Sequence, residues 1–289
     1  MPSPPDGPPP VESSPPAVRA FDAVARSFDS RFGSWESVAA QRRAVRRELL
    51  AVFPEGSSLL ELGGGTGEDA LFLAERGRRV TLTDGSPEMV ARAREKVRAA
   101  RLEGKVSTAQ VALEDLSRFV EDHLRAGRAP FDGCFSNFAS LNCVEHHGAL
   151  AQSLARVLSP GAHVLLVLFG PFSPGEILVL SARGNLHGAL RRFRRGPVPA
   201  RISGHDFTVW YPRPSDLARS FSPGFVLSRT RGIGIAVPPS SAEPWVSRLP
   251  RLVHFLERLD RHLTAPLALL GDHVLLDFVR TRNPAGEVR

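Results

Sequence analysis

Apolar and polar residues follow two different periods along the middle of the chain. Between residues 57 and 170, short apolar runs such as Ser58–Leu62 and His163–Gly170 are separated by stretches in which apolar residues recur every three to four positions. Short apolar runs are typical of buried strands, and the longer period is typical of amphipathic helices. Because the two kinds of element alternate, we predict an α/β fold with a doubly wound parallel sheet.

The remaining elements can be placed on the same pattern. One helix should span Glu68–Arg76, and a second should begin at Ser86-Pro87-Glu88, where an N-cap hydroxyl precedes a proline and an acid. A third helix should end at Ser159-Pro160-Gly161. Besides the two runs named above, strands are expected at 79–83, 106–112, 131–137, 225–229 and 273–280.

Two segments of the second half do not fit this alternation. Residues 171–224 contain the basic cluster RRFRR and the dipeptide Trp210-Tyr211, and residues 238–270 contain an amphipathic helix. We expect both insertions to cover a site at the strand ends. The expected organisation is a disordered proline-rich tail at 1–17, a core at 18–170, a lid at 171–224, and the last core strands at 225–289 with the helical insertion at 238–270.

Composition narrows the class of protein only slightly. The net charge is +7 and the pI about 10.7, but only two of the basic residues are lysines, a bias that suggests the codon usage of a GC-rich genome. Two cysteines, Cys134 and Cys143, are too few for a disulfide framework or a zinc site, so we expect a reduced, cytoplasmic protein without a metal. No apolar run approaches the ~20 residues that a membrane-spanning helix needs.

The glycine-rich turn after the first strand indicates a ligand. Gly63, Gly65 and Gly67 give G-x-G-x-G, a spacing that lets a ligand approach the backbone and the start of the next helix. Glu68 stands where the dinucleotide fingerprint requires glycine, and no Gly-Lys-Ser/Thr follows as in a P-loop. Asp84, at the end of the second strand, could accept both hydroxyls of a ribose. The pattern favours a nucleoside ligand without a pyrophosphate over a tight turn that binds nothing.

Five stretches in order resemble the motifs of one family, the class I S-adenosylmethionine-dependent methyltransferases. They are ELGGGTG at 61–67, TLTDGSPEMV at 81–90, ALEDL at 112–116, FDGCFSNFASLN at 131–142 and LSPGAHVLLVLF at 158–169. The resemblance covers roughly residues 20–170, and GDHVLLDFVR is similar to the family's final strand. It implies a Rossmann-like seven-stranded sheet whose last strand is antiparallel, with S-adenosyl-L-methionine as the cofactor.

The same resemblance implies roles for individual residues. Gly63 and Gly65 would line the methionine part of the cofactor, and Glu61 would support its ammonium group. The other residues implied to border the cofactor are Asp84 at the ribose, Gly85 beside it, Met89 near the adenine, Leu113 and Glu114 at the adenine edge, and Asn137, whose backbone would face the methionyl group.

Two positions depart from the family's pattern. Ala112 stands where an acid usually follows the third strand, so adenine recognition would rest on the backbone and on Glu114 or Asp115. Phe28 stands where a tyrosine is common in the leading segment, so a hydroxyl contact from that position is not expected.

The candidate catalytic residues are His147 and Tyr211. Methyl transfer requires an acceptor held in line with the donor, and some acceptors also need a base. His147 and its neighbour His146 follow the fourth strand, near the expected position of the methyl group, but could equally lie on an exposed helical turn. Tyr211 could bind substrate or pack inside the lid. His187 and His205 could reach in from the lid or lie on the surface.

We therefore predict a methyltransferase that acts on a small, hydrophobic molecule at oxygen, nitrogen or carbon. The fourth-strand motif SNFAS lacks the Asn/Asp-Pro-Pro-aromatic pattern of base N-methylation, and no Pro-Cys pair offers a nucleophile, so nucleic acid is not the expected substrate. RRFRR could bind phosphate or a membrane surface, or form a solvated helix face. The alternatives are an RNA methyltransferase and a non-catalytic S-adenosylmethionine-binding protein. The sequence does not predict the oligomeric state.

Overall fold

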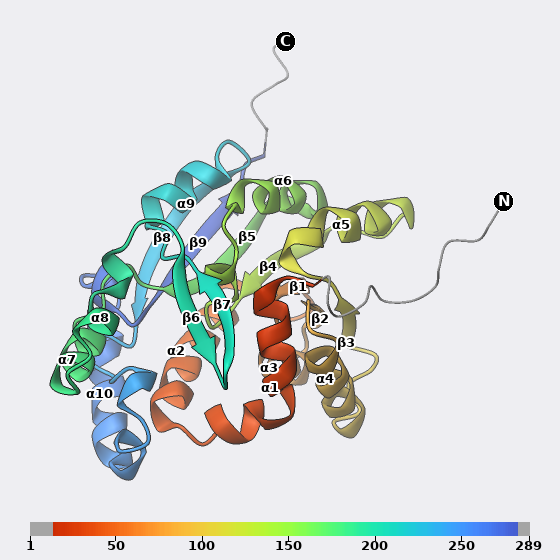
Figure 1. Cartoon of the computed structure of the whole chain (residues 1–289). Helices are drawn as coiled ribbons and strands as arrows, with labels where there is room; N and C mark the ends of the chain where they lie inside the picture. The colour runs from red at the N-terminus through yellow and green to blue at the C-terminus, as the bar shows by residue number, and fades with distance from the viewer. Residues whose placement is uncertain (1–13, 283–289) are drawn as a thin grey trace.

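A seven-stranded sheet with the strand order β3–β2–β1–β4–β5–β9–β8 forms the centre of the molecule (Figure 1). The computed structural model describes residues 14–282. Strands β1 to β5 are parallel to one another, and β9 runs antiparallel to both β5 and β8. The predicted fold class and the antiparallel last strand are thus confirmed. The strands are β1 (Ser58–Leu62), β2 (Arg79–Asp84), β3 (Val106–Gln110), β4 (Phe131–Ser136), β5 (Leu158–Phe169), β8 (Phe225–Ile233) and β9 (His273–Arg280).

Helices cover both faces of this sheet, which explains why its central strands are apolar throughout. On β1, Leu59 packs with α2, α3 and α4, whereas Leu60 and Leu62 pack with α5, α6 and α9. This alternation follows from the two-residue period of a strand. The helices are α1 (Pro16–Phe32), α2 (Glu36–Val52), α3 (Glu68–Glu75), α4 (Pro87–Ala99), α5 (Leu116–Arg125), α6 (His147–Val157) and α9 (Pro214–Phe221).

Local signals set many of the element ends, although β8 runs to Ile233, four residues beyond its predicted end. The Ser86 hydroxyl accepts a hydrogen bond from the Met89 N–H at 3.0 Å and caps α4, as predicted. Strand β5, however, begins at Leu158, five residues before the predicted start. Pro160 and Gly161 lie within the strand and do not precede it. Leu158 already pairs with Phe131 of β4, and a shift in the β4–β5 register follows that pair.

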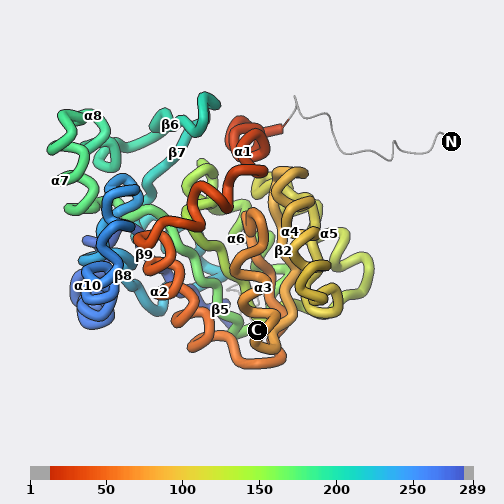
Figure 2. Tube along the Cα trace, turned by 90° about the horizontal axis from the view of Figure 1, so that it is seen from below, coloured from red at the N-terminus to blue at the C-terminus, as the bar shows by residue number. Residues whose placement is uncertain are grey.

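The two insertions contain further elements at one end of the sheet (Figure 2). After β5 come α7 (Pro174–Ala182), α8 (Leu186–Ala189) and a hairpin of β6 (Val198–Ile202) and β7 (His205–Val209), and α10 (Pro250–Leu263) lies between β8 and β9. The hairpin packs on α1 through Phe207 and Phe21, whose ring centroids are 5.6 Å apart. None of the helices within 14–282 is long and apolar enough to cross a bilayer.

Helix α9 belongs to the sheet rather than to the overhanging segment. Its Phe221 stacks on Phe278 of β9, with ring centroids 4.6 Å apart, and Leu217 joins the same core cluster. The part of 171–224 that stands away from the sheet is therefore 171–213. Of the predicted tail at 1–17, residues 1–13 lie outside the described residues, and α1 already begins at Pro16.

Candidate functional site

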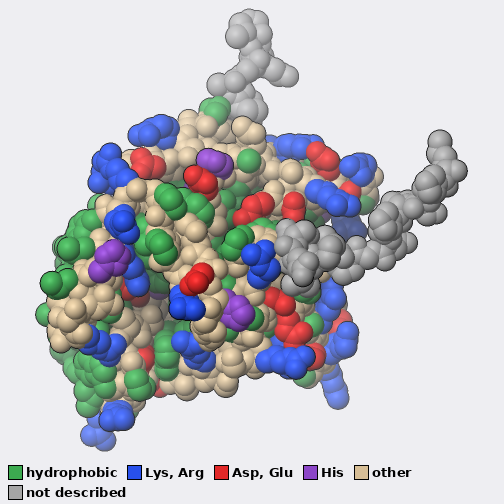
Figure 3. All heavy atoms as spheres, viewed as in Figure 1, with side chains coloured by type: hydrophobic (Ala, Val, Ile, Leu, Met, Phe, Trp, Pro, Cys, Tyr) green, Lys and Arg blue, Asp and Glu red, His purple; other side chains and the backbone are tan. Residues whose placement is uncertain are grey.

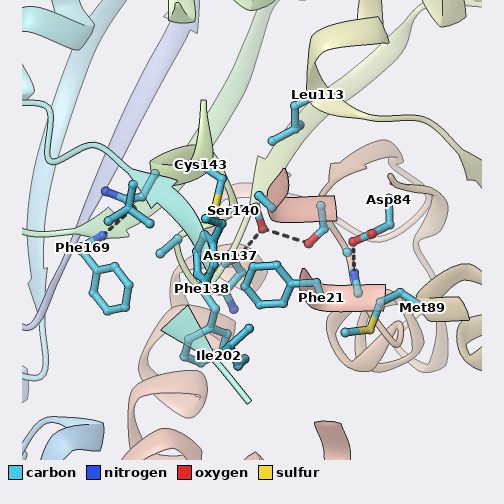
Figure 4. Close-up of a pocket in the computed structure, with 18 of the residues that line it drawn as sticks. Phe21, Asp84, Met89, Leu113, Asn137, Phe138, Ser140, Cys143, Phe169 and Ile202 are labelled. Carbon is cyan, nitrogen blue, oxygen red and sulfur yellow. Dashed lines mark hydrogen bonds between the residues drawn. The ribbon is translucent and has the colours of Figure 1, made fainter. Parts of the chain in front are cut away.

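A cavity of about 530 Å³ lies at the carboxyl ends of the parallel strands, beneath the β6–β7 hairpin (Figure 4). Its walls are the loops that follow β1 to β4, helices α1 and α2, and the hairpin itself. Figure 4 shows Asp84 and Met89 at one side of the cavity and Phe169 at the other, with Asn137 and Phe138 between them. Open α/β sheets bind their ligands at this edge, and the volume suits a cofactor-sized molecule.

The glycines after β1 are required for two different reasons. Gly63 (φ +61°) and Gly65 (φ +56°) both have left-handed backbone conformations that other residues rarely adopt. A side chain at Gly63 would also place its Cβ 2.4 Å from the Cβ of Ser140, whereas a Cβ at Gly65 would meet no atom within 4 Å. Gly63 therefore lets two loops approach each other, and Gly65 leaves its backbone open to the cavity.

Asp84 is held by the backbone with acceptor capacity left over. Its Oδ2 accepts a hydrogen bond from the Gly65 N–H at 2.8 Å, and its Oδ1 accepts one from the Ser86 N–H at 2.9 Å. Burial raises the pKa of the Asp84 carboxyl, and these two N–H groups oppose that shift. Each carboxylate oxygen has a second lone pair, so the group can accept from two hydroxyls of a ligand.

Glu61 and Arg42 bring two unsatisfied polar atoms to the cavity. Glu61 is 2% exposed, and its Oε2 has no hydrogen-bond partner in the described part of the chain. Burial and then the charge of Asp69 raise the pKa of Glu61 well above its usual value. The Nε of Arg42 is also buried without a partner, and its guanidinium lies 4.8 Å from the centroid of the Phe138 ring. Because unpaired buried groups are costly, these atoms mark places for a ligand.

The loop after β4 has a strained backbone. Phe138 (φ +50°) and Ala139 (φ +67°) are consecutive non-glycine residues in the left-handed region. The Ala139 N–H donates to the Val167 carbonyl at 3.0 Å, and both ends of the Asn137 side-chain amide are occupied, by Asp69 and by the Phe138 N–H. Such strain persists where the surroundings fix it, and here it presents the Phe138 ring to the cavity.

The half of the cavity farther from Asp84 is mainly apolar and aromatic. The rings of Phe169 and Tyr211 have centroids 6.4 Å apart, and burial raises the pKa of the Tyr211 hydroxyl. Arg191 adds a cation whose Nε is buried without a partner among residues 14–282. This half forms a wall that excludes water from an acceptor. The apolar and aromatic lining of the cavity as a whole includes Phe21, Phe28, Phe32, Phe138, Phe169, Ile202, Phe207, Val209 and Tyr211.

The cavity brings together the residues predicted to bind the cofactor. Tyr211, predicted as a catalytic residue, lines it as well. The nine residues predicted at the cofactor that line the cavity are Glu61, Gly63, Gly65, Asp84, Gly85, Met89, Leu113, Glu114 and Asn137.

His147, the other catalytic candidate, lies elsewhere. It is not among the described residues that line this cavity but lies at a second one, beside Trp210 and Arg213. Its imidazole is buried, with Nε2 3.1 Å from the Leu141 carbonyl oxygen, and burial lowers its pKa. Its position at the first residue of α6 turns the ring toward the preceding loop, and we leave it out of the site.

The sequence did not single out His273, the first residue of β9, which lines the cavity. Its ring stacks on Phe169 with centroids 4.6 Å apart and meets Phe138 edge-on at 5.8 Å. Its Nδ1 lies 2.8 Å from Oε1 of Gln41, whose Nε2 donates to Oδ2 of Asp272 at 3.3 Å. Burial lowers the pKa of His273 to about 4.

This chain of contacts fixes the tautomer of His273. A carboxylate only accepts hydrogen bonds, so the Gln41 amide must direct its NH₂ to Asp272 and its carbonyl oxygen to His273. The proton of the neutral imidazole therefore lies on Nδ1. No described residue makes a hydrogen bond to Nε2, whose lone pair remains available to a ligand.

The comparisons with known proteins agree with the topology. Residues 59–161 match the family described as a methyltransferase domain. Malonyl-[acyl-carrier protein] O-methyltransferase of Serratia marcescens is 34% identical over 148 residues, 50% of this chain and 51% of that protein. The tRNA 5-carboxymethoxyuridine methyltransferase of Escherichia coli is 29% identical over 123 residues, 43% of this chain and 44% of that protein. The chain thus spans about half the length of the curated relatives it matches.

A solved structure extends the likeness in fold over most of the chain. The cyclase SpnF superposes with a TM-score of 0.59 at 16% identity and covers 93% of this chain and 98% of its own. The family match over residues 59–161 and the strand order bear out the resemblance to class I S-adenosylmethionine-dependent methyltransferases, and the solved structure shows the same fold.

Proposed function

We propose that this protein transfers the methyl group of S-adenosyl-L-methionine to a small, largely apolar acceptor. The observation that carries the proposal is the division of one cavity into a polar half built for a zwitterionic nucleoside and an aromatic half beside it. Resemblance to the family alone does not establish the activity, because a neighbour of the same fold is described as a cyclase. The proposal therefore rests on the groups in the cavity.

In the polar half, each unsatisfied group has a counterpart on the cofactor. Asp84 would accept hydrogen bonds from the two ribose hydroxyls, Glu61 would bind the ammonium group, and Arg42 would bind the carboxylate; all three residues line the cavity. Met89 and Leu113 provide apolar contacts for the adenine. When bound, the cofactor supplies a methyl group on a positively charged sulfur. That charge disappears during transfer, so the uncharged aromatic wall beyond Asn137 suits the transition state.

In the aromatic half, His273 accepts the proton that the acceptor loses. An acceptor hydroxyl or N–H donates to Nε2 of His273, and as the new bond to carbon forms, its proton becomes strongly acidic. A weakly basic imidazole is then sufficient to take that proton and later pass it to water. Since the pKa of His273 is about 4, its Nε2 is unprotonated at neutral pH.

A carboxylate is the second candidate acceptor. The buried, unpartnered Nε of Arg191 lies in the lining of the cavity and suits an anionic oxygen. The relatives named for malonyl and carboxymethoxy groups have substrates that carry carboxylates. A carboxylate has no proton to lose, so it would not require His273. The two candidates therefore differ in the effect of substituting that histidine.

The test uses cofactor labelled in its methyl group. The full chain is incubated with it and an extract of its own cells, with and without ribonuclease. We expect label in the small-molecule fraction, unchanged by ribonuclease and reduced with Asp84→Ala at cofactor concentrations below saturation. Label that disappears with ribonuclease would replace the proposal by an RNA methyltransferase. Cofactor binding without any transfer would replace it by a non-catalytic binding protein. A cytoplasmic location, expected from the two cysteines, which are both free, is part of this proposal.

A further inference from the structure

The large hydrophobic side chains that the described residues expose are concentrated in two segments. All of them except Leu124 and Val226 lie within residues 178–193 or 245–269. Leu178 is 72% exposed, and Leu186 and Phe255 are each 63% exposed. We name these exposed hydrophobic side chains of 178–193 and 245–269 the apolar patch. Single exposed hydrophobic residues are ordinary, but a concentration of them marks an interaction surface.

The two segments lie against each other in space. Val179 of α7 packs on a small cluster that contains Val246 and Val253, and the Arg183 guanidinium donates to the Ser241 carbonyl at 2.6 Å. Figures 1 and 2 show α7 and α8 on the same side of the molecule as α10. Figure 3 shows hydrophobic side chains gathered there, with arginines among them. The apolar patch is thus one surface.

The charge of this surface has a single sign. The acids within 171–195 and 245–270 are Glu176, Glu257 and Asp260, and all three are buried. Each is bound inward: Glu176 to Arg191 and Arg192, Glu257 to Arg43 and Arg47, and Asp260 to backbone N–H groups. The exposed charged residues of these segments are arginines, namely Arg183, Arg194, Arg195, Arg248, Arg251, Arg258 and Arg261.

Helix α10 turns its two acidic side chains toward the protein and several large apolar side chains toward solvent. Glu257 and Asp260 face the protein, whereas Leu252, Phe255 and Leu259 face outward at spacings of three and four residues. Helices at a protein surface usually place their apolar stripe toward the core. The outward leucines and phenylalanine flanked by arginines are instead typical of a helix that lies in a membrane interface.

We propose that the apolar patch binds the surface of an anionic lipid bilayer, with its leucine and aromatic side chains among the acyl chains and its arginines at the lipid phosphates. A second copy of this chain fits poorly, because it would oppose the same arginines with no exposed acid to pair with them. RNA would use the arginines but gain nothing from exposed leucines. A membrane surface suits both kinds of side chain, because its acyl chains receive the leucines and its phosphates lie about one side-chain length away, where the arginines reach them.

The patch adjoins the cavity. Arg191 and Ser240 line the cavity and belong to the same region as the exposed residues. Binding to a bilayer would therefore bring the aromatic half of the cavity close to the lipid, in which apolar molecules concentrate. The inference does not depend on the proposed function, because vesicle binding is measured without cofactor or acceptor.

The test is flotation of the full chain with vesicles of phosphatidylcholine alone or mixed with phosphatidylglycerol. We expect binding to the anionic vesicles only, weaker at high salt. Arg251→Glu with Arg258→Glu, and separately Leu252→Ala with Phe255→Ala, should each lower the partition coefficient at least about tenfold. The matched controls, Arg98→Glu with Arg118→Glu on α4 and α5, and Leu124→Ala with Val226→Ala, should leave it unchanged.

Three results would overturn the proposal. The first is failure of the unaltered chain to bind anionic vesicles, and the second is equal loss in the patch and control variants. The third is another occupant: a dimer in light scattering that Leu252→Ala with Phe255→Ala dissociates, or RNA binding without vesicle binding that only the arginine variant loses. Circular dichroism and the melting temperature establish that each variant is folded, which is expected because the altered side chains are exposed.

Discussion

The two halves of the cavity are assembled from the chain in different ways. The polar half comes from consecutive strand ends between Glu61 and Asn137, where each loop contributes a short motif. The aromatic half combines α1, the end of β5, the hairpin and the first residue of β9, which are as much as 232 residues apart where Gln41 contacts His273. The residues expected to bind the methyl donor thus lie in short motifs after consecutive strands. The residues that face the methyl acceptor come together only through contacts between distant segments.

The largest expected effect concerns the aromatic half. With a methyl acceptor that carries O–H or N–H, His273→Ala should lower kcat by at least about 100-fold, because no base then receives the proton that this substrate loses. Affinity for S-adenosylhomocysteine, measured by calorimetry, should be unchanged. His187→Ala, at an exposed position in α8, is the control. An unaltered kcat for such an acceptor would contradict the role of His273, while for a carboxylate acceptor it is the expected result.

The pH dependence of stability tests the same residue without a substrate. The folded-state pKa of His273, about 4, lies below its ordinary 6.5. The unfolded chain therefore takes up this proton first, and stability present above pH 6.5 is lost as the pH falls toward 4. The loss amounts to about 3 kcal/mol. Urea unfolding between pH 7 and pH 4 should show a shallower decline for His273→Gln. Parallel curves would contradict the burial of a neutral imidazole.

Substitutions at two glycines test how closely the loops of the polar half pack. Gly63→Ala should lower the free energy of unfolding by about 3 kcal/mol, because the new Cβ meets Ser140 in addition to the backbone strain. Gly65→Ala has only the strain and should cost about 1 kcal/mol. Adding Ser140→Gly to Gly63→Ala should recover part of the loss in urea unfolding. Equal costs at the two positions would mean that the close approach of the loops is unimportant.

The smallest of these effects concerns the ribose. Asp84→Ala should weaken S-adenosylhomocysteine binding at least about tenfold, since two hydroxyls lose a charged acceptor. Asp122→Ala, an exposed carboxylate on α5, should bind with unaltered affinity. Calorimetry that gives equal dissociation constants for the two variants would remove Asp84 from the site.

Local patterns predicted the core well because its elements depend on local signals. The bounds of β1 and β9 were predicted without error, and α3 within one residue, since their apolar runs are ended by glycine or polar residues. The start of β5 was predicted late, because a proline and a glycine that usually end an element are accommodated here by a register shift.

The acceptor groups could not be predicted for a physical reason. Nothing near His273 in the sequence distinguishes it from a surface histidine, because its tautomer depends on Gln41 in a distant helix. Arg42 resembles its neighbours Arg43, Arg46 and Arg47, and only the fold places its Nε against the cavity. His147, chosen from its position after a strand, turned toward a neighbouring carbonyl instead.

A crystal structure with S-adenosylhomocysteine tests the central claim most directly, because it fixes which half of the cavity receives the donor. We predict the ribose hydroxyls on Asp84, the ammonium group at Oε2 of Glu61, and the sulfur directed past Asn137 into a still open aromatic half that contains Nε2 of His273. A ligand that fills the aromatic half, or a sulfur directed away from it, would contradict the account.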